Sequence, residues 1–234
     1  MSLAHRLHQS ELMDSLDVDV IAHKQALRSL GRLNAISLSS LIVWPTLREL
    51  AVETPARPLR VLDLACGGGD MICRLDRWSR RAGLKMEWVG FDRSSLAVQL
   101  ARDLARRNGV TATFEVKDVL ADELPRGFDV VMCSLFLHHL TECDAIQLLR
   151  RMSEVTVRTV LANDLWRTRW GYALTWLGCH LLTRSYICRV DGPRSVAGAF
   201  TKQEVLELAT HAGCTNPRFS RHWPLRFLLR WDRS

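Results

Sequence analysis

A short apolar segment runs directly into a glycine-rich turn, and this feature limits the possible folds more than any other. Arg60–Leu64 is followed by Ala65-Cys66-Gly67-Gly68-Gly69, and a helical pattern begins at Asp70. Glycines in such a turn let the backbone approach a ligand closely and place N–H groups at the start of a helix. Asp92 ends the next apolar segment, where α/β nucleotide-binding folds hold ribose hydroxyls with a carboxylate. The sequence therefore indicates a nucleotide-binding strand–turn–helix unit.

Segments with strand and helix periodicity alternate along the rest of the chain. Helical patterns begin at capping residues such as Thr141 and Thr201, and one ends at Gly109. Strands are expected over 60–64, 86–91, 111–116, 128–135 and 155–162 and on both sides of Pro224, with helices over 21–50, 70–81, 141–154 and 201–213 and a further helix that Ser94 or Ser95 caps and Gly109 ends. This alternation predicts a parallel sheet covered by helices on both faces.

The glycine-rich turn does not fit the common phosphate-binding motifs. A dinucleotide fingerprint needs a third glycine where Ile72 stands, and a P-loop needs G-K-[ST], which this turn lacks. Asp63 and Asp70 lie on either side of the turn and would repel phosphate groups. The two acids favour instead a ligand that carries a positive charge and an amino group.

The run Asp63–Gly69, D-L-A-C-G-G-G, resembles motif I of the class I S-adenosylmethionine-dependent methyltransferases, usually written [DE]-x-G-x-G-x-G, with Ala65 in place of the first glycine. The resemblance continues through 90–92 (G-F-D), 117–119 (K-D-V) and 128–140, and it extends over residues 57 to 165. Within the family, the pattern is most similar to ubiquinone- and menaquinone-type enzymes and to natural-product methyltransferases.

The resemblance implies a Rossmann-like α/β domain with a seven-stranded, mostly parallel sheet, helices on both faces and an antiparallel last strand. Residues 57–234 would form this methyltransferase domain. The prolines within 54–58 separate it from residues 1–56, which would form a helical cover over the cofactor site without contributing to the sheet. The implied cofactor is S-adenosylmethionine. Its expected contacts are Asp63, Ala65, Gly67, Gly69, Asp70, Asp92, Asp118, Val119 and Ser134.

Two histidines, His138 and His139, follow the fourth predicted strand at the edge where open α/β sheets bind ligands. In an extended segment their side chains would face opposite ways, so at most one is expected to face the acceptor. The family often keeps a histidine at the second position, which favours His139 as the base for a hydroxyl acceptor, with His138 as the other candidate. The alternative is a histidine that hydrogen-bonds the backbone and only shapes the loop.

The segment Gly171–Leu182 is uncharged and apolar, and arginines flank it. Class I methyltransferases commonly insert acceptor-binding elements here, so residues 165–200 are expected to form such an insertion. The alternatives are a core helix and an amphipathic helix at a membrane surface. The run 191–194, D-G-P-R, predicts a turn. The candidate acceptor contacts are Trp170, Leu174, Trp176, Arg194 and His222.

The expected activity is methylation of a small, largely hydrophobic acceptor, phenolic or quinone-like. O-methylation is the first choice and C-methylation of a quinone or polyketide-like acceptor is the second. A net charge of +7, from 32 basic and 25 acidic residues, would also suit RNA or DNA. Nucleic acid is disfavoured because Ser134-Leu135-Phe136 stands where adenine-modifying enzymes have N-P-P-[FYW]. A non-catalytic protein that keeps the fold is the third possibility.

Metal chemistry and membrane insertion are not expected. Asn163-Asp164 ends the fifth predicted strand, but the fourth ends in Cys133-Ser134-Leu135 without an acid that could complete a Mg²⁺ site. No uncharged apolar run reaches the ~18 residues of a membrane span. The seven cysteines lack zinc-site spacing, and we interpret them as reduced thiols of a cytoplasmic protein. The sequence leaves the oligomeric state open.

Overall fold

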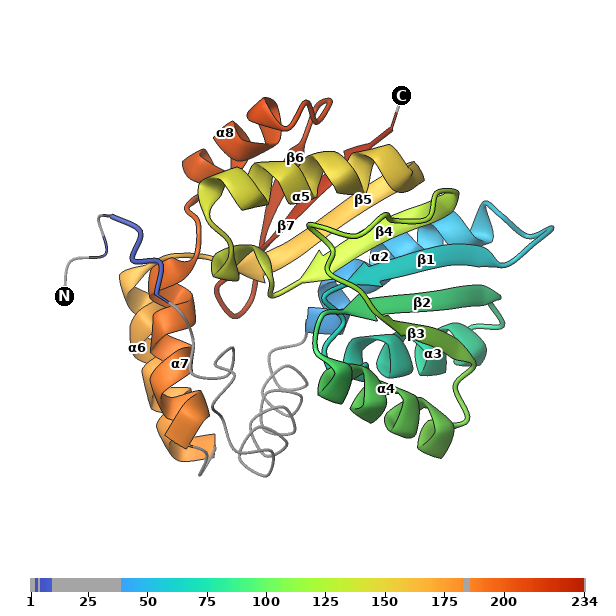
Figure 1. The fold of residues 1–234 in the computed structure, drawn as a ribbon, viewed down its shortest axis with the longest axis horizontal. Coiled ribbons are helices and arrows are strands. Elements are labelled where there is room, and N and C mark those ends of the chain that lie inside the picture. The colour runs from blue at the N-terminus through green and yellow to red at the C-terminus, as the bar shows by residue number, and fades with distance from the viewer. Residues whose placement is uncertain (1–2, 4, 10–38, 183–185, 234) are drawn as a thin grey trace.

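The fold is built on one seven-stranded sheet. The computed structural model describes residues 3, 5–9, 39–182 and 186–233. The strand order is β3-β2-β1-β4-β5-β7-β6 (Figure 1). All neighbouring pairs are parallel except those of β7, which is antiparallel to β5 and to β6. This confirms the Rossmann-like sheet with an antiparallel last strand. The strands are β1 (Leu59–Leu64), β2 (Met86–Asp92), β3 (Ala112–Val116), β4 (Phe128–Ser134), β5 (Thr156–Leu165), β6 (Arg218–His222) and β7 (Arg226–Asp232).

Helices cover both faces of the sheet, as predicted. One core cluster joins α5 and α8 to the sheet, and a second joins α2, α3 and α4 to the opposite face (Figure 1). A short 3-10 helix, η2 (Leu137–His139), follows β4, and α6 and α7 stand together beyond the end of β5. The helices are α2 (Ser39–Val52), α3 (Asp70–Arg81), α4 (Ser95–Asn108), α5 (Glu142–Val155), α6 (Arg169–Leu182), α7 (Tyr186–Gly198) and α8 (Lys202–His211).

The helix starts are fixed by local side-chain caps. Ser94 Oγ accepts a hydrogen bond from the N–H of Ala97, and Thr141 caps α5 in the same way. At α8, Thr201 and Glu204 form a complete capping box. These contacts involve residues three positions apart, which is why the sequence alone could place these helices.

Helix α2 belongs to the core of the sheet domain. Val43 and Leu47 are buried against β1 and its neighbours, in the same cluster as Val61 and Leu161. The expectation that residues up to 56 only cover the cofactor site is therefore wrong for this helix, because a chain that began at 57 would expose the core under it. The remainder of the predicted cover, including the helix expected from residue 21, lies largely outside the described residues.

The run 191–194 forms part of a helix, so the turn predicted there is wrong. Gly192 and Pro193 lie inside α7. A Cβ at Gly192 would lie 2.5 Å from the sulfur of Cys179 on α6, so the missing side chain lets the two helices pack closely. Gly192 is needed here for helix–helix packing. The sequence pattern alone does not distinguish a glycine that packs two helices from a glycine in a turn.

Candidate functional site

The glycine-rich turn leaves β1 in a conformation that suits close approach of a ligand. Ala65, Gly67 and Gly69 all have positive φ, at 57°, 54° and 74°. A Cβ at Gly69 would lie 2.8 Å from Cβ of Ala101, so this glycine is required for packing of the turn against α4. Cβ atoms at Gly67 and Gly68 would meet no atom within 4 Å. These two glycines therefore present bare backbone to open space at the start of α3.

Asp92 lies at the end of β2, directly beside this turn. Its carboxylate accepts a hydrogen bond from the N–H of Gly67 at 2.8 Å and another from the N–H of Ser94 at 2.9 Å. The side chain is half-buried, so a ligand beside the turn can reach it. Asp92 therefore fastens the turn and can also accept hydroxyl groups of a ligand.

Three carboxyl groups gather around the turn. Burial raises the pKa of Asp63 well above its usual value, and the nearby Asp70 and Asp92 raise it further. Burial likewise raises the pKa of Asp70. Among the described residues, Asp63 Oδ1 has no hydrogen-bond partner. A buried carboxyl oxygen without a partner, in a cluster of acids, is suited to a ligand that brings a positive charge.

We expect Asp63→Asn to make the ligand-free protein more stable at pH 7 and to weaken binding of a cationic ligand. A carboxyl group whose pKa is higher in the folded than in the unfolded protein stabilises the fold at a pH below its unfolded pKa. This contribution is lost as the pH rises through the folded pKa. The neutral amide removes that loss, which should add about 1–2 kcal/mol to the free energy of unfolding. Urea unfolding at pH 5 and pH 8 measures it. A variant less stable than wild type at pH 8 would contradict the expectation.

The other expected cofactor contacts lie on the same edge of the sheet. The N–H of Lys117 donates to the carbonyl of Asp92 at 3.0 Å, which brings the loop with Asp118 and Val119 to the end of β2. Asp118 is exposed and accepts a hydrogen bond from the N–H of Leu120, while Val119 is buried. Ser134 ends β4, and its Oγ accepts a hydrogen bond from Asn163 at 2.6 Å. The structure therefore brings these residues to the rim that carries the turn.

The two histidines lie side by side, so the predicted extended segment with opposed side chains is wrong. Both belong to η2, and their ring centroids are 4.3 Å apart. His138 is buried, with Nδ1 2.6 Å from Oδ1 of Asp164, and its backbone N–H donates to the other oxygen of that carboxylate. His139 is half-buried, and its ring is tilted by 34° relative to that of His138. One histidine is thus held by a buried acid, and the other lies nearer the surface.

The partner of His138 is a residue that the sequence placed near the rim without a role. Burial opposes ionisation of Asp164, but the His138 ring and the N–H groups of Leu165 and His138 outweigh it and lower its pKa. Arg226, on β7, is also buried and close enough to interact with Asp164; burial lowers the pKa of Arg226 to about 10. This group spans β4, β5 and β7, and no local pattern links its members.

The first residues of the chain hold the histidine loop from outside. Arg6 donates to the carbonyls of His138, Leu140 and Gly198 at 3.1, 2.6 and 2.5 Å. His8 Nε2 lies 2.8 Å from the carbonyl oxygen of His139. Sequence reasoning missed Arg6, because an arginine this close to the N-terminus carries no signal of a partner so far along the chain.

The expected acceptor contacts divide into two groups. Trp176 and Arg194 line a cavity of about 300 Å³ between α6 and α7. Trp170 and Leu174 do not line it; they are 78% and 44% exposed. His222 ends β6, four strand spacings from β1, which is roughly 19 Å at ~4.8 Å per spacing. The remaining lining residues are Leu7, Gln9, Tyr172, Arg189, Val190, Pro193 and Ala197.

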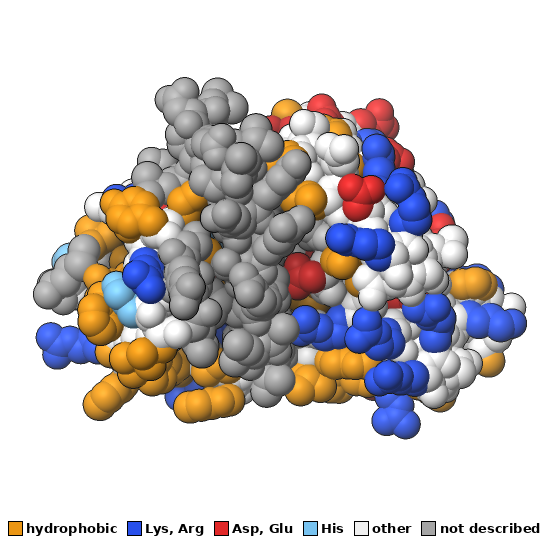
Figure 2. Space-filling view, turned by 90° about the horizontal axis from the view of Figure 1, so that it is seen from below, with side chains coloured by type: hydrophobic (Ala, Val, Ile, Leu, Met, Phe, Trp, Pro, Cys, Tyr) orange, Lys and Arg blue, Asp and Glu red, His pale blue; other side chains and the backbone are white. Residues whose placement is uncertain are grey.

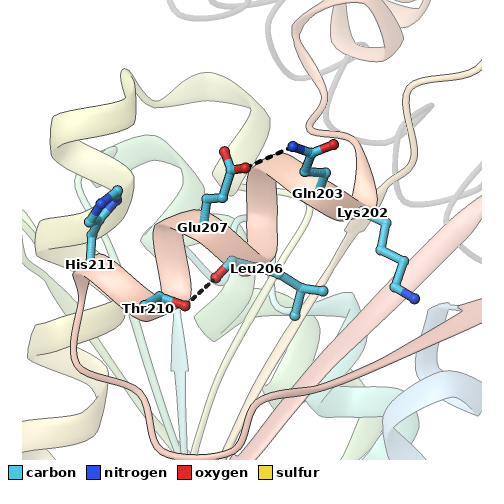
Figure 3. Close-up of a pocket in the computed structure, with 6 residues that line it drawn as sticks. All are labelled: Lys202, Gln203, Leu206, Glu207, Thr210 and His211. Carbon is cyan, nitrogen blue, oxygen red and sulfur yellow. Dashed lines mark hydrogen bonds between the residues drawn. The ribbon is translucent and has the colours of Figure 1, made fainter.

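A second hollow, of about 530 Å³, lies on the outside of α8. Figure 3 shows that all of its lining side chains project from this one helix. It is a surface depression, and none of the predicted site residues lines it. Its lining consists of Lys202, Gln203, Leu206, Glu207, Thr210 and His211.

The described part of the chain has neither a metal-binding cluster nor a membrane-spanning helix. Within residues 3, 5–9, 39–182 and 186–233, no three His, Cys, Asp or Glu side chains are grouped closely enough to hold a metal ion. In the same part of the chain, no helix has the length and apolar character to cross a bilayer. All seven cysteines are free thiols, and only Cys143 is exposed.

Part of the chain is similar to known methyltransferases in sequence. Residues 61–158 match the protein family described as "Methyltransferase domain". Over 99 residues, which is 42% of this chain, the sequence is 30% identical to a ubiquinone biosynthesis O-methyltransferase from Chelativorans sp. (strain BNC1). The chain spans only 36% of the length of that relative.

Two solved structures share the fold over nearly the whole chain. Magnesium protoporphyrin IX methyltransferase from Synechocystis PCC 6803, with bound SAH, superposes with a TM-score of 0.58 at 18% identity, covering 94% of this chain and 90% of that one. The plantazolicin methyltransferase BpumL, in complex with SAH, gives a TM-score of 0.69 at 15% identity, with coverage of 95% and 94%. At such identities the likeness concerns the fold.

Proposed function

We propose that this chain, which carries a class I S-adenosylmethionine-dependent methyltransferase domain, transfers the methyl group of S-adenosylmethionine to a small, largely hydrophobic acceptor. The observation that carries the proposal is the turn after β1, where Gly67 and Gly68 face open space beside the carboxyl groups of Asp63, Asp70 and Asp92. S-adenosylmethionine has a sulfonium, an ammonium group and ribose hydroxyls, and it has no phosphate. Its chemistry therefore fits a site built from bare backbone and acids.

The residues around the turn contact different parts of S-adenosylmethionine in this proposal. Asp92 accepts the ribose hydroxyls, because its carboxylate lies at the end of β2 directly beside the glycine-rich turn. Asp63 and Asp70 give the negative potential that attracts the amino acid end of the cofactor. Asp118 and Val119 lie where the resemblance assigns contacts with the adenine. When bound, the cofactor supplies an electrophilic methyl group, and the protein contributes position and exclusion of water.

We infer that His139 takes the proton from a hydroxyl acceptor. A phenol of pKa ~10 is mostly neutral at pH 7, so a nearby base speeds its attack on the methyl group. His138 is committed to Asp164 and buried, whereas His139 is half-buried beside it. In this proposal His138 and Asp164 are positioning residues that hold the ring of His139 through the close, tilted contact of the two imidazoles, and Arg6 holds the loop.

The cavity between α6 and α7 is our candidate for the acceptor site. Trp176 and Tyr172 give it aromatic walls, and Arg194 can hold an anionic edge such as a phenolate or a carboxylate. It adjoins the histidine loop, because the N–H of Leu7, in its lining, donates to Ala197 while the neighbouring His8 contacts His139. These contacts support residues 165–200 as the acceptor-binding insertion, and O-methylation is the reaction that we propose because His139 lies on the adjoining loop.

The distribution of basic side chains speaks against a nucleic acid acceptor. Figure 2 shows many Lys and Arg side chains over one half of the molecule. Arg80, Arg81, Arg106 and Arg107 lie in the last turns of α3 and α4, where cations complement the helix dipoles. Those turns lie at the opposite edge of the sheet from the glycine-rich turn, so this charge is not placed to guide a polynucleotide to the cofactor.

The proposal is tested by supplying the protein with S-adenosylmethionine labelled in the methyl group. We expect label in an organic extract when a catechol or a hydroquinone with an alkyl chain is the acceptor, and NMR of the product should show a methyl ether. A new methyl group on ring carbon would assign C-methylation instead. Label that enters RNA or DNA, with none in the small molecules, would contradict the proposal.

The free thiols are consistent with a cytoplasmic location, which we also propose.

A further inference from the structure

Helix α6 exposes a continuous apolar stripe. Trp170, Leu174, Leu177 and Leu181 recur at helical spacing along one side and are 78%, 44%, 46% and 73% exposed. The opposite side of the helix, including Cys179, is buried against α7. We call these four side chains the apolar stripe. The apolar stripe is an exposed hydrophobic surface, and the opposite side of the same helix already packs against α7.

Exposed large hydrophobic side chains are concentrated here. Six of the eleven found on the described part of the chain lie between residues 170 and 186: the apolar stripe, Trp176 and Tyr186. Scattered exposed hydrophobic residues are ordinary, but a contiguous group usually marks an interaction surface. The concentration on two neighbouring helices therefore requires a partner.

The charge around the apolar stripe has a single sign. Between residues 165 and 200 the only acid is Asp191, which is 4% exposed. Arg169 is exposed, and Arg189 and Arg194 are half-buried. Figure 2 shows hydrophobic side chains gathered at the end of the molecule that carries α6 and α7, with a few Lys and Arg side chains among them, while the visible acids lie mainly over the other half. The surface therefore matches a partner that is apolar and negatively charged.

We propose that α6 and α7 dock this protein on the surface of an anionic lipid bilayer. In this arrangement α6 lies in the plane of the membrane. The leucines of the apolar stripe enter the acyl boundary, Trp170 and Tyr186 lie at the headgroup level, and Arg169 contacts lipid phosphates. Fourteen residues make a helix of about 21 Å, which is too short to span a bilayer but long enough to rest on one.

A second copy of this chain fits the surface less well. A two-fold contact through the apolar stripe would bring the arginines of both copies, Arg169 and Arg189 among them, to one interface, and no exposed acid between 165 and 200 could neutralise them. The inference is independent of the proposed reaction, because it rests on surface chemistry alone.

The test is sedimentation with lipid vesicles. We expect the protein to bind vesicles of equal parts phosphatidylcholine and phosphatidylglycerol, and to bind pure phosphatidylcholine, or mixed vesicles in 0.5 M salt, at least tenfold more weakly. The double variant L177Q/L181Q should lose at least tenfold in vesicle affinity while its thermal unfolding midpoint is unchanged. The matched control is Trp223→Gln, which alters an equally exposed side chain (74%) outside α6 and should bind as wild type does.

Three outcomes would overturn the proposal. The first is absence of the wild-type protein from the anionic vesicle pellet. The second is a double variant that binds these vesicles as tightly as wild type. The third is a wild-type dimer in sedimentation velocity that the double variant abolishes, without vesicle binding, which would assign the apolar stripe to a second copy of the chain.

Discussion

Replacing Asp92 with alanine is expected to weaken binding of S-adenosylhomocysteine about 10- to 150-fold, which corresponds to about 1.5–3 kcal/mol for lost hydrogen bonds to a charged group. The carboxylate is proposed to accept the ribose hydroxyls, and it also accepts the N–H groups of Gly67 and Ser94. The substitution therefore removes a ligand contact and loosens the turn that carries the other contacts. Calorimetric titration at 25 °C measures the affinity directly.

Two further variants separate binding from loss of fold. Asp92→Asn keeps an acceptor oxygen and should lose less affinity than Asp92→Ala. The control is Asp103→Ala, which removes an exposed carboxylate from α4 that pairs only with Arg106 among the described residues. This control should bind as wild type does. An alanine variant at position 92 with unchanged affinity would show that the ribose is held elsewhere.

Replacing Asp164 with alanine should lower the free energy of unfolding by about 3–5 kcal/mol, the cost of removing one partner from a buried ion pair. The carboxylate lies 2.6 Å from His138 Nδ1 and accepts the N–H groups of His138 and Leu165. Without it, the buried Arg226 also loses a nearby negative charge. Urea unfolding at pH 7 measures the loss. The matched control is Glu207→Ala, an exposed acid on α8, which should change stability by less than ~0.5 kcal/mol.

The loss at Asp164 should depend on pH in a defined direction. A carboxyl whose pKa is lowered by folding gives stability that is present above its unfolded pKa of ~3.9 and is lost as the pH falls through the folded value. The difference between wild type and Asp164→Ala should therefore be full at pH 7 and shrink below about pH 4. A difference that stays constant down to pH 3, or an unchanged stability at pH 7, would show that the pair with His138 contributes little.

Local patterns predicted the sheet and most of its helices well. The bounds of α3 were predicted at both ends, 70 and 81, because an acid begins the helix and a glycine follows its last turn. The caps at Ser94, Thr141 and Thr201 act over three residues and can be read from the chain. The glycine-rich turn was also predictable, because glycine adopts the positive φ found at Gly67 and Gly69 more readily than other residues do.

The sequence was least informative where distant residues decide the structure. Local signals predicted a turn around Pro193, but this segment is helical, and its glycine allows close packing against Cys179 of the neighbouring helix. The pair formed by His138 and Asp164 joins η2 to β5, and neither residue has a local motif. The division of α6 into a face against α7 and an exposed stripe also depends on the partner helix, because the segment is apolar on all sides.

The most direct test of the account is a calorimetric titration of S-adenosylhomocysteine into the 234-residue chain. We predict saturable binding of one molecule per chain, which NAD and ATP do not reproduce and which Asp92→Ala weakens at least tenfold. A folded protein that binds NAD or ATP but gives no saturable heat with S-adenosylhomocysteine would contradict the proposed cofactor and, with it, the proposed methyl transfer.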